Sequence, residues 1–176
     1  MSAAPAAAAA PVTGLIVRAC CLILHDGEVA LIHRQRPDGD QYSVPGGVVH
    51  ADEDVAAALA RELDEELELN VTDLPRPPEL RWVQDQMTTR PGTTTLFRRL
   101  HLIHVLDLPS RARQAMAETE LDAEDYARII WTPLGHTIGL HLYPAVGPAI
   151  NGLARSRAAV GPVLLPPITD ENYSWR

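Results

Sequence analysis

The chain has 176 residues, a length that fits one domain, and its formal net charge at pH 7 is −8. This acidic balance argues against broad, sequence-independent nucleic-acid binding, which needs a basic face. All 15 basic residues are arginine, so the sequence excludes mechanisms that depend on a lysine Schiff base or a P-loop lysine.

The N-terminal segment, residues 1–13, is rich in alanine and proline, and we expect it to be a disordered tail. It lacks the positive start and strongly apolar stretch of a secretory signal. No run in the sequence is long and apolar enough to span a bilayer. The adjacent Cys20 and Cys21 form a poor disulfide pair. These features predict a cytoplasmic protein without membrane association.

The first third of the chain shows the apolar runs and turn residues of β-structure. The pattern predicts strands over 15–24, 29–36 and 42–44, a hairpin turn over 25–28, a polar loop over 38–40 and a sharp turn at 45–47.

Residues 53–68 form the clearest predicted helix, with Asp52, Glu53 and Asp54 suited to its N-terminus. The remaining sequence predicts strands over 79–88, 94–106 and 128–131, an acidic loop or short helix over 109–125, a helix over 144–159 and a proline-rich tail from 162. Strands dominate, with two helices, so the fold class is one mixed α/β domain.

The predicted helix over 53–68 has an apolar stripe of Ala56, Leu59, Leu63 and Leu67 that must face a core. Three acidic residues lie at the rim of this stripe.

Glu62 and Glu66 are one helical turn apart, and Glu65 lies within reach of the same small volume. Carboxylates this close repel each other, but a hard divalent cation such as Mg²⁺ would neutralise them. Arg61 could orient one of the carboxylates through a bidentate pair. The alternative interpretation is a solvated acidic helix face.

The whole segment from Gly47 to Leu69 resembles the Nudix box. The matching residues are Gly47, then Glu53 after five residues, and Arg61-Glu62-Leu63 followed by Glu65-Glu66. The flanking runs Tyr42 to Gly47 and Trp131 to Leu134 are also similar to the family. The departure is Glu68, where the family has a glycine that ends the helix with a positive φ. Either Glu68 accepts that conformation or Asn70 moves the cap downstream.

This resemblance implies a Nudix-like α/β/α sandwich with a mixed central sheet and a loop–helix–loop box. It implies a domain over 14–160. Residues 161–176 are a proline-rich C-terminal tail, and Tyr173 and Trp175 would dock this tail on the domain or on a partner subunit.

The resemblance also implies a pyrophosphohydrolase that uses Mg²⁺ or Mn²⁺. Its small-molecule substrate would be a nucleoside diphosphate linked to a moiety X, such as a nucleotide sugar, ADP-ribose, a dinucleoside polyphosphate or a modified nucleoside triphosphate. Carried over by position, Glu62, Glu65 and Glu66 would hold the metal together with the carbonyl of Gly47. Glu62 or a downstream acid would be the base, and Glu53 with Arg61 would brace the segment.

The downstream acid is assigned to Glu124, with Glu120 as the second choice; an exposed acidic loop is the alternative. Arg34 and Arg36 could clamp phosphates, unless they form a solvated strand end. Tyr42 or Trp82 could stack on a nucleobase, and core packing is the alternative for both.

Two other functions are compatible with the same fold. One is a non-catalytic nucleotide-metabolite sensor, which would bind without turnover. The other is an isomerase, which requires a catalytic cysteine in the pocket. The oligomeric state stays open, with a homodimer among the options.

Overall fold

The computed structural model describes residues 14–119, 127–155 and 163–175. The predicted N-terminal tail, the acidic residues around Glu124 and the end of the predicted helix over 144–159 lie outside these ranges.

The described residues form one sheet with three α-helices and two 3-10 helices. The strands are β1 (Ile16–His25), β2 (Glu28–Arg36), β3 (Gly39–Ser43), β4 (Gly46–Val48), β5 (Glu79–Thr89), β6 (Leu96–Asp107), β7 (Arg128–Pro133), β8 (Leu142–Tyr143) and β9 (Ile168–Thr169). The helices are α1 (Val55–Leu67), α2 (Ser110–Ala115) and α3 (Gly147–Arg155), with 3-10 turns at Val71–Asp73 and Leu134–His136.

The sheet mixes parallel and antiparallel pairing, as expected. Its strand order is β8-β3-β2-β1-β6-β5-β9, while β4 adds to β1 and β7 adds to β2. The two central strands, β1 and β6, run parallel, and the hairpin partners β1–β2 and β5–β6 run antiparallel.

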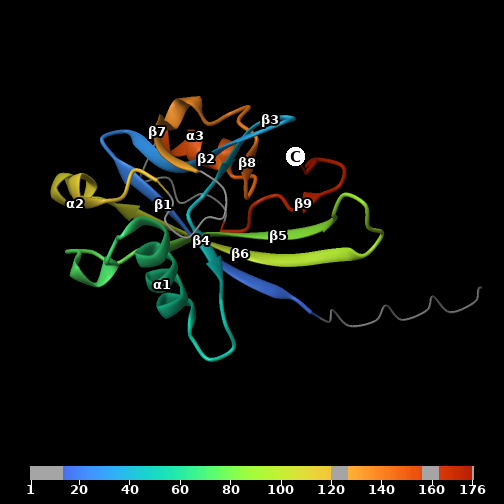
Figure 1. The fold of residues 1–176 in the computed structure, drawn as a ribbon, viewed down its shortest axis with the longest axis horizontal. Helices are drawn as coiled ribbons and strands as arrows, with labels where there is room; N and C mark the ends of the chain where they lie inside the picture. The colour runs from blue at the N-terminus through green and yellow to red at the C-terminus, as the bar shows by residue number, and fades with distance from the viewer. Residues whose placement is uncertain (1–13, 120–126, 156–162, 176) are drawn as a thin grey trace, which may run out of the picture.

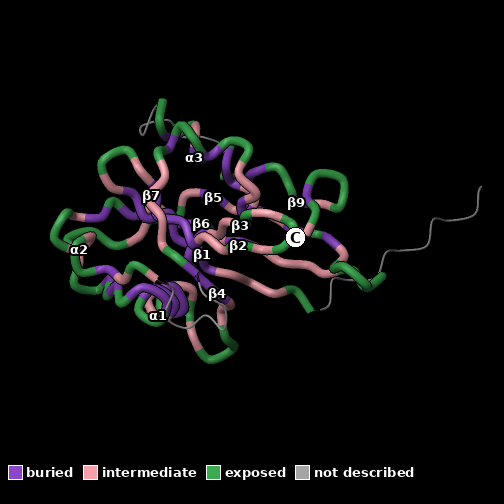
Figure 2. Tube along the Cα trace, turned by 45° about the horizontal axis from the view of Figure 1, so that its top comes forward, coloured by how far each residue is buried: buried purple, intermediate pink, exposed green. Residues whose placement is uncertain are grey.

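Two hydrophobic cores lie on opposite faces of β1 because successive side chains of a strand alternate in direction. Cys20, Leu22 and Leu24 pack with α3 in one core, whereas Ala19, Cys21 and Ile23 pack with α1 in the other. The sheet therefore separates α1 from α3 (Figure 1), and its central strands are the most deeply buried part of the molecule (Figure 2). The α/β/α arrangement is confirmed.

The β1–β2 hairpin follows the prediction. Asp26 and Gly27 both have positive φ, 45° and 82°, which is the requirement of a tight two-residue turn that matches strand twist. The next hairpin is tighter than expected, because Arg36 pairs with Gly39 and leaves only Pro37 and Asp38 in the loop. The predicted polar loop over 38–40 is therefore largely strand.

Of the predicted turn at Pro45-Gly46-Gly47, Pro45 is a bend, whereas Gly46 and Gly47 belong to β4, which pairs antiparallel with β1. Gly46 has a φ of 126° and lies so close to β1 that a Cβ would overlap the carbonyl of Ala19. Glycine is therefore required by both the backbone angle and the close approach.

Helix α1 begins after Asp54, whose side chain accepts a hydrogen bond from the backbone N–H of Ala57 at 2.8 Å. It ends at Glu68, which adopts the left-handed conformation with φ 53° and donates its N–H to the carbonyls of Leu63 and Asp64. Of the two alternatives for the helix end, the structure selects the strained Glu68, and Asn70 caps the following 3-10 turn instead.

The prediction of the apolar stripe was wrong for one residue. Ala56 is exposed, whereas Leu59, Leu63 and Leu67 are buried. These leucines are spaced by four residues, and the same row continues to Val55, which packs against the α1-side core. Ala56 lies beside this row, on the solvent side.

No helix among the described residues is long and apolar enough to cross a membrane.

Candidate active site

Arg61 on α1 ties the helix to the loop that precedes it. Its Nε and Nη2 donate to the two carboxylate oxygens of Glu53 at 3.0 and 2.7 Å, and Nη2 also donates to the carbonyl of Val48 at 3.2 Å. Its Nη1 donates to Glu62 at 2.8 Å and to Glu65 at 3.1 Å. One guanidinium therefore fixes the loop, the helix and two of the three predicted metal ligands.

The ion pair has a clear electrostatic signature. Hydrogen bonds from Arg61, with a further one from the backbone N–H of His50, lower the pKa of Glu53 to about 2. The same bond with Glu53 is the main factor that raises the pKa of the Arg61 guanidinium. Both groups are charged at neutral pH, as the predicted brace requires.

Two carboxylates of α1 meet the glycine strand β4. Glu66 is 7% exposed, and its Oε2 accepts a hydrogen bond from the backbone N–H of Gly46 at 2.8 Å. Glu62 is 9% exposed and lies against Gly47, where a Cβ would overlap its carboxylate. The third carboxylate, Glu65, is exposed and is held by Arg61. The fold thus buries two acids at a backbone segment that has no side chains.

A pocket of about 220 Å³ opens beside these groups and is lined by Arg18, Ile32, Arg34, Arg36, Gln41, Ser43, Val44, Gly46, Glu66 and Tyr143. Three guanidinium groups face it from β1 and β2, and Glu66 faces it from α1. Positive side chains beside a buried carboxylate suit a polyanion that is bound together with a cation.

Strand pairing explains why Arg34 and Arg36 line the pocket and Tyr42 does not. Arg34 pairs with Gln41 in the β2–β3 ladder, and its Nη1 donates to Ser43 at 3.1 Å. Tyr42 lies between Gln41 and Ser43, so its ring points to the other face of the sheet. There it stacks on His33, with ring centroids 5.0 Å apart, and packs against the α3-side core. Tyr42 thus packs as the core alternative describes, and its stacking on a nucleobase stays a prediction.

Trp82 also follows the packing alternative. Its side chain is 4% exposed and belongs to the α3-side core with Leu22, Leu24 and Ile103. A ring enclosed by core residues has no free face for a nucleobase, and the packing alternative applies.

The predicted downstream acid Glu124, and Glu120 with it, lie outside the described residues. The isomerase hypothesis lacks its required group, because Cys20 and Cys21 are fully buried in the two cores and neither lines the pocket. Burial also raises the pKa of both thiols, which opposes thiolate formation.

The donor set fits a divalent cation without forming a closed cage. Among the described residues, no three His, Cys, Asp or Glu side chains converge into a ready metal-binding group. Glu62 and Glu66 nevertheless bring two buried carboxylates to the backbone of Gly46 and Gly47. Mg²⁺ commonly takes one or two carboxylates and completes its shell with water and substrate phosphates.

Arg18 and Tyr143 are pocket residues that the sequence did not single out as candidates. Arg18 reaches the pocket from β1, where it donates a hydrogen bond to the carbonyl of Gly46. A charged residue inside an otherwise apolar strand was the available signal. For Tyr143 the sequence offers no such signal, because the pairing of β8 with Ser43 of β3 brings this residue to the pocket.

Comparisons with known proteins agree with this geometry. The family model described as NUDIX domain matches residues 14–141. A protein of Mycobacterium tuberculosis with the provisional name 8-oxo-dGTP diphosphatase 2 is 37% identical over 124 residues, which cover 69% of this chain and 79% of the relative.

Solved structures share the fold at low identity. The crystal structure of a MutT protein from Methanosarcina mazei is 18% identical with a TM-score of 0.57, and the similarity covers 82% of this chain and 96% of that one. A Caenorhabditis elegans Ap4A hydrolase is 17% identical with a TM-score of 0.54, covering 81% of this chain and 98% of that one.

Proposed function

The chain belongs to the NUDIX family, and we propose that it hydrolyses the pyrophosphate bond of a nucleoside diphosphate derivative with the help of a divalent cation. One observation carries this proposal. Glu62 and Glu66 are buried against the Gly46–Gly47 backbone, at the edge of a pocket with three arginines.

Glu62, Glu66 and the backbone carbonyl of Gly47 would hold the cation, and Glu65 would join them by leaving Arg61. The cation, Mg²⁺ or Mn²⁺, would neutralise the pyrophosphate and lower the pKa of a bound water. Phosphoryl transfer needs placement and charge more than a covalent nucleophile, so this site requires no serine or cysteine.

The arginines of the pocket would bind the phosphate oxygens. Arg34 and Arg36 point into the pocket from β2, and Arg18 points into it from β1. Guanidinium groups bind phosphate through paired N–H donors, and three of them can orient a chain of two or more phosphates.

The reaction balances with groups of this site. A water oxygen attacks one phosphorus, the bond from that phosphorus to the bridging oxygen breaks, and the leaving phosphate keeps the electron pair. The proton of the water passes to a carboxylate, for which Glu62 or an acid of the 120–125 segment is the candidate. Arg61 acts only indirectly, because it orients Glu62 through a 2.8 Å hydrogen bond.

The relative's name suggests which substrate to test first. The M. tuberculosis protein, 37% identical to this chain, is named for 8-oxo-dGTP. The Ap4A hydrolase with the same fold is named for a dinucleoside polyphosphate, and its identity of 17% carries the fold alone. We therefore propose an oxidised deoxynucleoside triphosphate as the leading substrate class, with the other nucleoside diphosphate derivatives behind it.

A substrate panel tests the proposed function. The purified chain would be incubated with 8-oxo-dGTP, dGTP, ADP-ribose, a nucleotide sugar and a dinucleoside polyphosphate, and products would be separated by anion-exchange chromatography. We expect at least one compound to be hydrolysed in Mg²⁺ and none in EDTA.

The sensor hypothesis predicts a different outcome from the same panel. Calorimetry would show binding of a panel compound, and no product would form at any metal concentration. That result would replace the hydrolase by a sensor, and the absence of both binding and product would reject both functions.

A further inference from the structure

Residues 163–175 form a strap along one edge of the sheet, beyond the 14–141 segment that the family model matches. Val83 exchanges backbone hydrogen bonds with Val163 and Leu165 at 2.7 and 2.9 Å, and β9 pairs with β5 in parallel. Asp170 then accepts a hydrogen bond from the backbone N–H of Thr89 at 2.9 Å. The strap is therefore fixed to β5 along its length (Figure 1).

The end of the strap turns back onto Tyr143. Ring centroids of Tyr143 lie 6.0 Å from Tyr173 and 5.2 Å from Trp175, and Ile168 completes this aromatic cluster. A charged residue also contacts this cluster: the Arg90 guanidinium lies over Trp175, 5.7 Å from its ring centroid. Trp175 thus packs directly against a residue that lines the substrate pocket.

Tyr143 is held tightly on its other sides. Its hydroxyl donates to Gln86 at 2.8 Å and accepts from Arg99 at 2.9 Å. The Arg18 guanidinium lies 5.5 Å from the centroid of its ring. The ring of Tyr143 therefore contacts Tyr173 and Trp175 of the strap as well as Arg18.

Arg18 connects this cluster to the acidic end of the pocket. Arg18 donates a hydrogen bond to the backbone carbonyl of Gly46. The backbone N–H of Gly46 in turn donates a hydrogen bond to Glu66. The Nε of Arg18 is buried and has no hydrogen-bond partner in the described structure. A contact path therefore runs from Trp175 through Tyr143 and Arg18 to the backbone beside Glu66.

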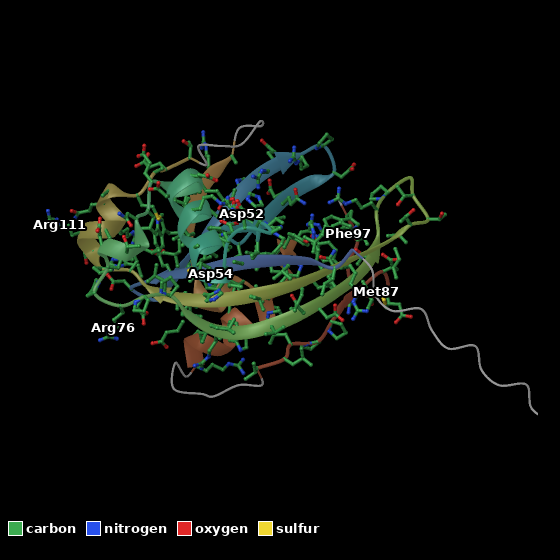
Figure 3. The ribbon with its side chains drawn as sticks, turned by 90° about the horizontal axis from the view of Figure 1, so that it is seen from below. Asp52, Asp54, Arg76, Met87, Phe97 and Arg111 are labelled. Atoms are coloured by element: carbon green, nitrogen blue, oxygen red, sulfur yellow. The ribbon has the colours of Figure 1, made fainter. Side chains whose placement is uncertain are left out.

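We propose that Trp175 is a positioning residue for phosphate binding: it fixes the Tyr143 ring, which fixes the Arg18 guanidinium at the pocket wall. This inference rests on the proposed function for the identity of the anion. Phe97, on the β5–β6 hairpin (Figure 3), contacts Arg90 and Arg99, which also contact Trp175 and Tyr143, but Phe97 itself does not line the pocket.

The test separates binding from turnover. With a hydrolysed panel compound, Trp175→Ala should raise KM by about tenfold and change kcat by less than about threefold, since the cation–aromatic arrangement affects binding rather than the carboxylates. Trp175→Phe keeps a ring against Tyr143 and should restore most of the KM. Leu153→Ala removes a buried side chain of α3 away from the pocket, so it should lower Tm while KM stays unchanged.

A second readout does not need catalysis. Isothermal titration with imidodiphosphate and Mg²⁺ should show binding to the full chain, weakened by about tenfold in Trp175→Ala. Wild-type binding of imidodiphosphate without turnover of any nucleotide would reject the proposed function and leave the positioning role measurable. The positioning role is overturned if wild type does not bind imidodiphosphate, or if Trp175→Ala binds it as tightly as wild type does.

Discussion

Adjacent glycines at positions 46 and 47 have different tasks. Gly46 combines a φ of 126° with close contact to the β1 backbone, where a Cβ would overlap the Ala19 carbonyl. At Gly47 the atoms nearest to a Cβ would be those of the Glu62 carboxylate, the far end of a flexible side chain. The first glycine is required by the fold, and the second leaves room for a functional carboxylate.

This difference predicts opposite effects for two matched substitutions. Gly46→Ala forces a strained backbone away from β1 and should lower the free energy of unfolding by about 3 kcal/mol. Gly47→Ala should displace Glu62, lowering kcat/KM by about 10- to 100-fold with little change in Tm. Calorimetry and kinetics on both variants check the pair. Equal losses of Tm in the two variants would contradict the separation.

At the level of single residues, only part of the candidate site could be predicted from the sequence. The carboxylates of α1 could be found because the whole pattern from Gly47 to Glu66 is contiguous in sequence. The sequence left the roles of Tyr42 and Trp82 open between base stacking and core packing, because it shows that neighbouring strand residues alternate but not which face carries the site. Tyr143 could not be found at all, since a long-range strand pairing brings it to the pocket.

At the scale of the element, α1 and its preceding loop form a braced unit. The carboxylate of Glu53 accepts hydrogen bonds from Arg61 and from the backbone N–H of His50. Arg61 also donates a hydrogen bond to the carbonyl of Val48. The unit also tolerates Glu68 at its C-terminus in a left-handed conformation that favours glycine. We infer that the brace and the buried leucines together hold the helix end in place.

The brace has a predicted pH dependence. The pKa of Glu53 is lowered to about 2 from an ordinary value of 4.5, so its ionised form is favoured in the folded state. Its contribution to stability is complete above pH 4.5 and is lost as the pH falls toward 2. Urea denaturation should therefore show that Glu53→Gln is less stable than wild type at pH 7, with a difference that vanishes near pH 2.

Glu171→Gln provides the control for this measurement. Glu171 is an exposed glutamate of the strap and takes no part in the ion pair of Glu53 with Arg61. The stability difference between this variant and wild type should stay nearly constant with pH. A Glu53→Gln difference that persists at pH 2 would contradict the assigned role of the ion pair.

At the scale of the whole molecule, the fold brings residues of several strands and of α1 to one pocket. Arg18 comes from β1, Arg34 and Arg36 come from β2, and Glu66 comes from α1. Most strands were predictable because apolar runs and turn residues are local signals. The order of the strands was not, because the parallel pairing of β1 with β6 joins segments about 80 residues apart in the chain.

The acidic net charge of the chain does not describe the charge at the pocket. The three guanidinium groups in the pocket face a carboxylate surface that would carry a divalent cation when substrate binds. An overall net charge of −8 is thus compatible with binding a polyanion, because the local charge decides recognition.

Removal of one buried carboxylate tests the central claim most directly. Gln at position 66 can still accept the hydrogen bond from Gly46, so Glu66→Gln should fold with nearly the wild-type Tm. With Mg²⁺ and the panel compound that wild type hydrolyses best, its kcat/KM should fall by about 100-fold or more. Asp64→Asn, which removes an exposed charge from the same helix, should keep the wild-type rate. A Glu66→Gln variant with wild-type kcat/KM would contradict a catalytic site at α1.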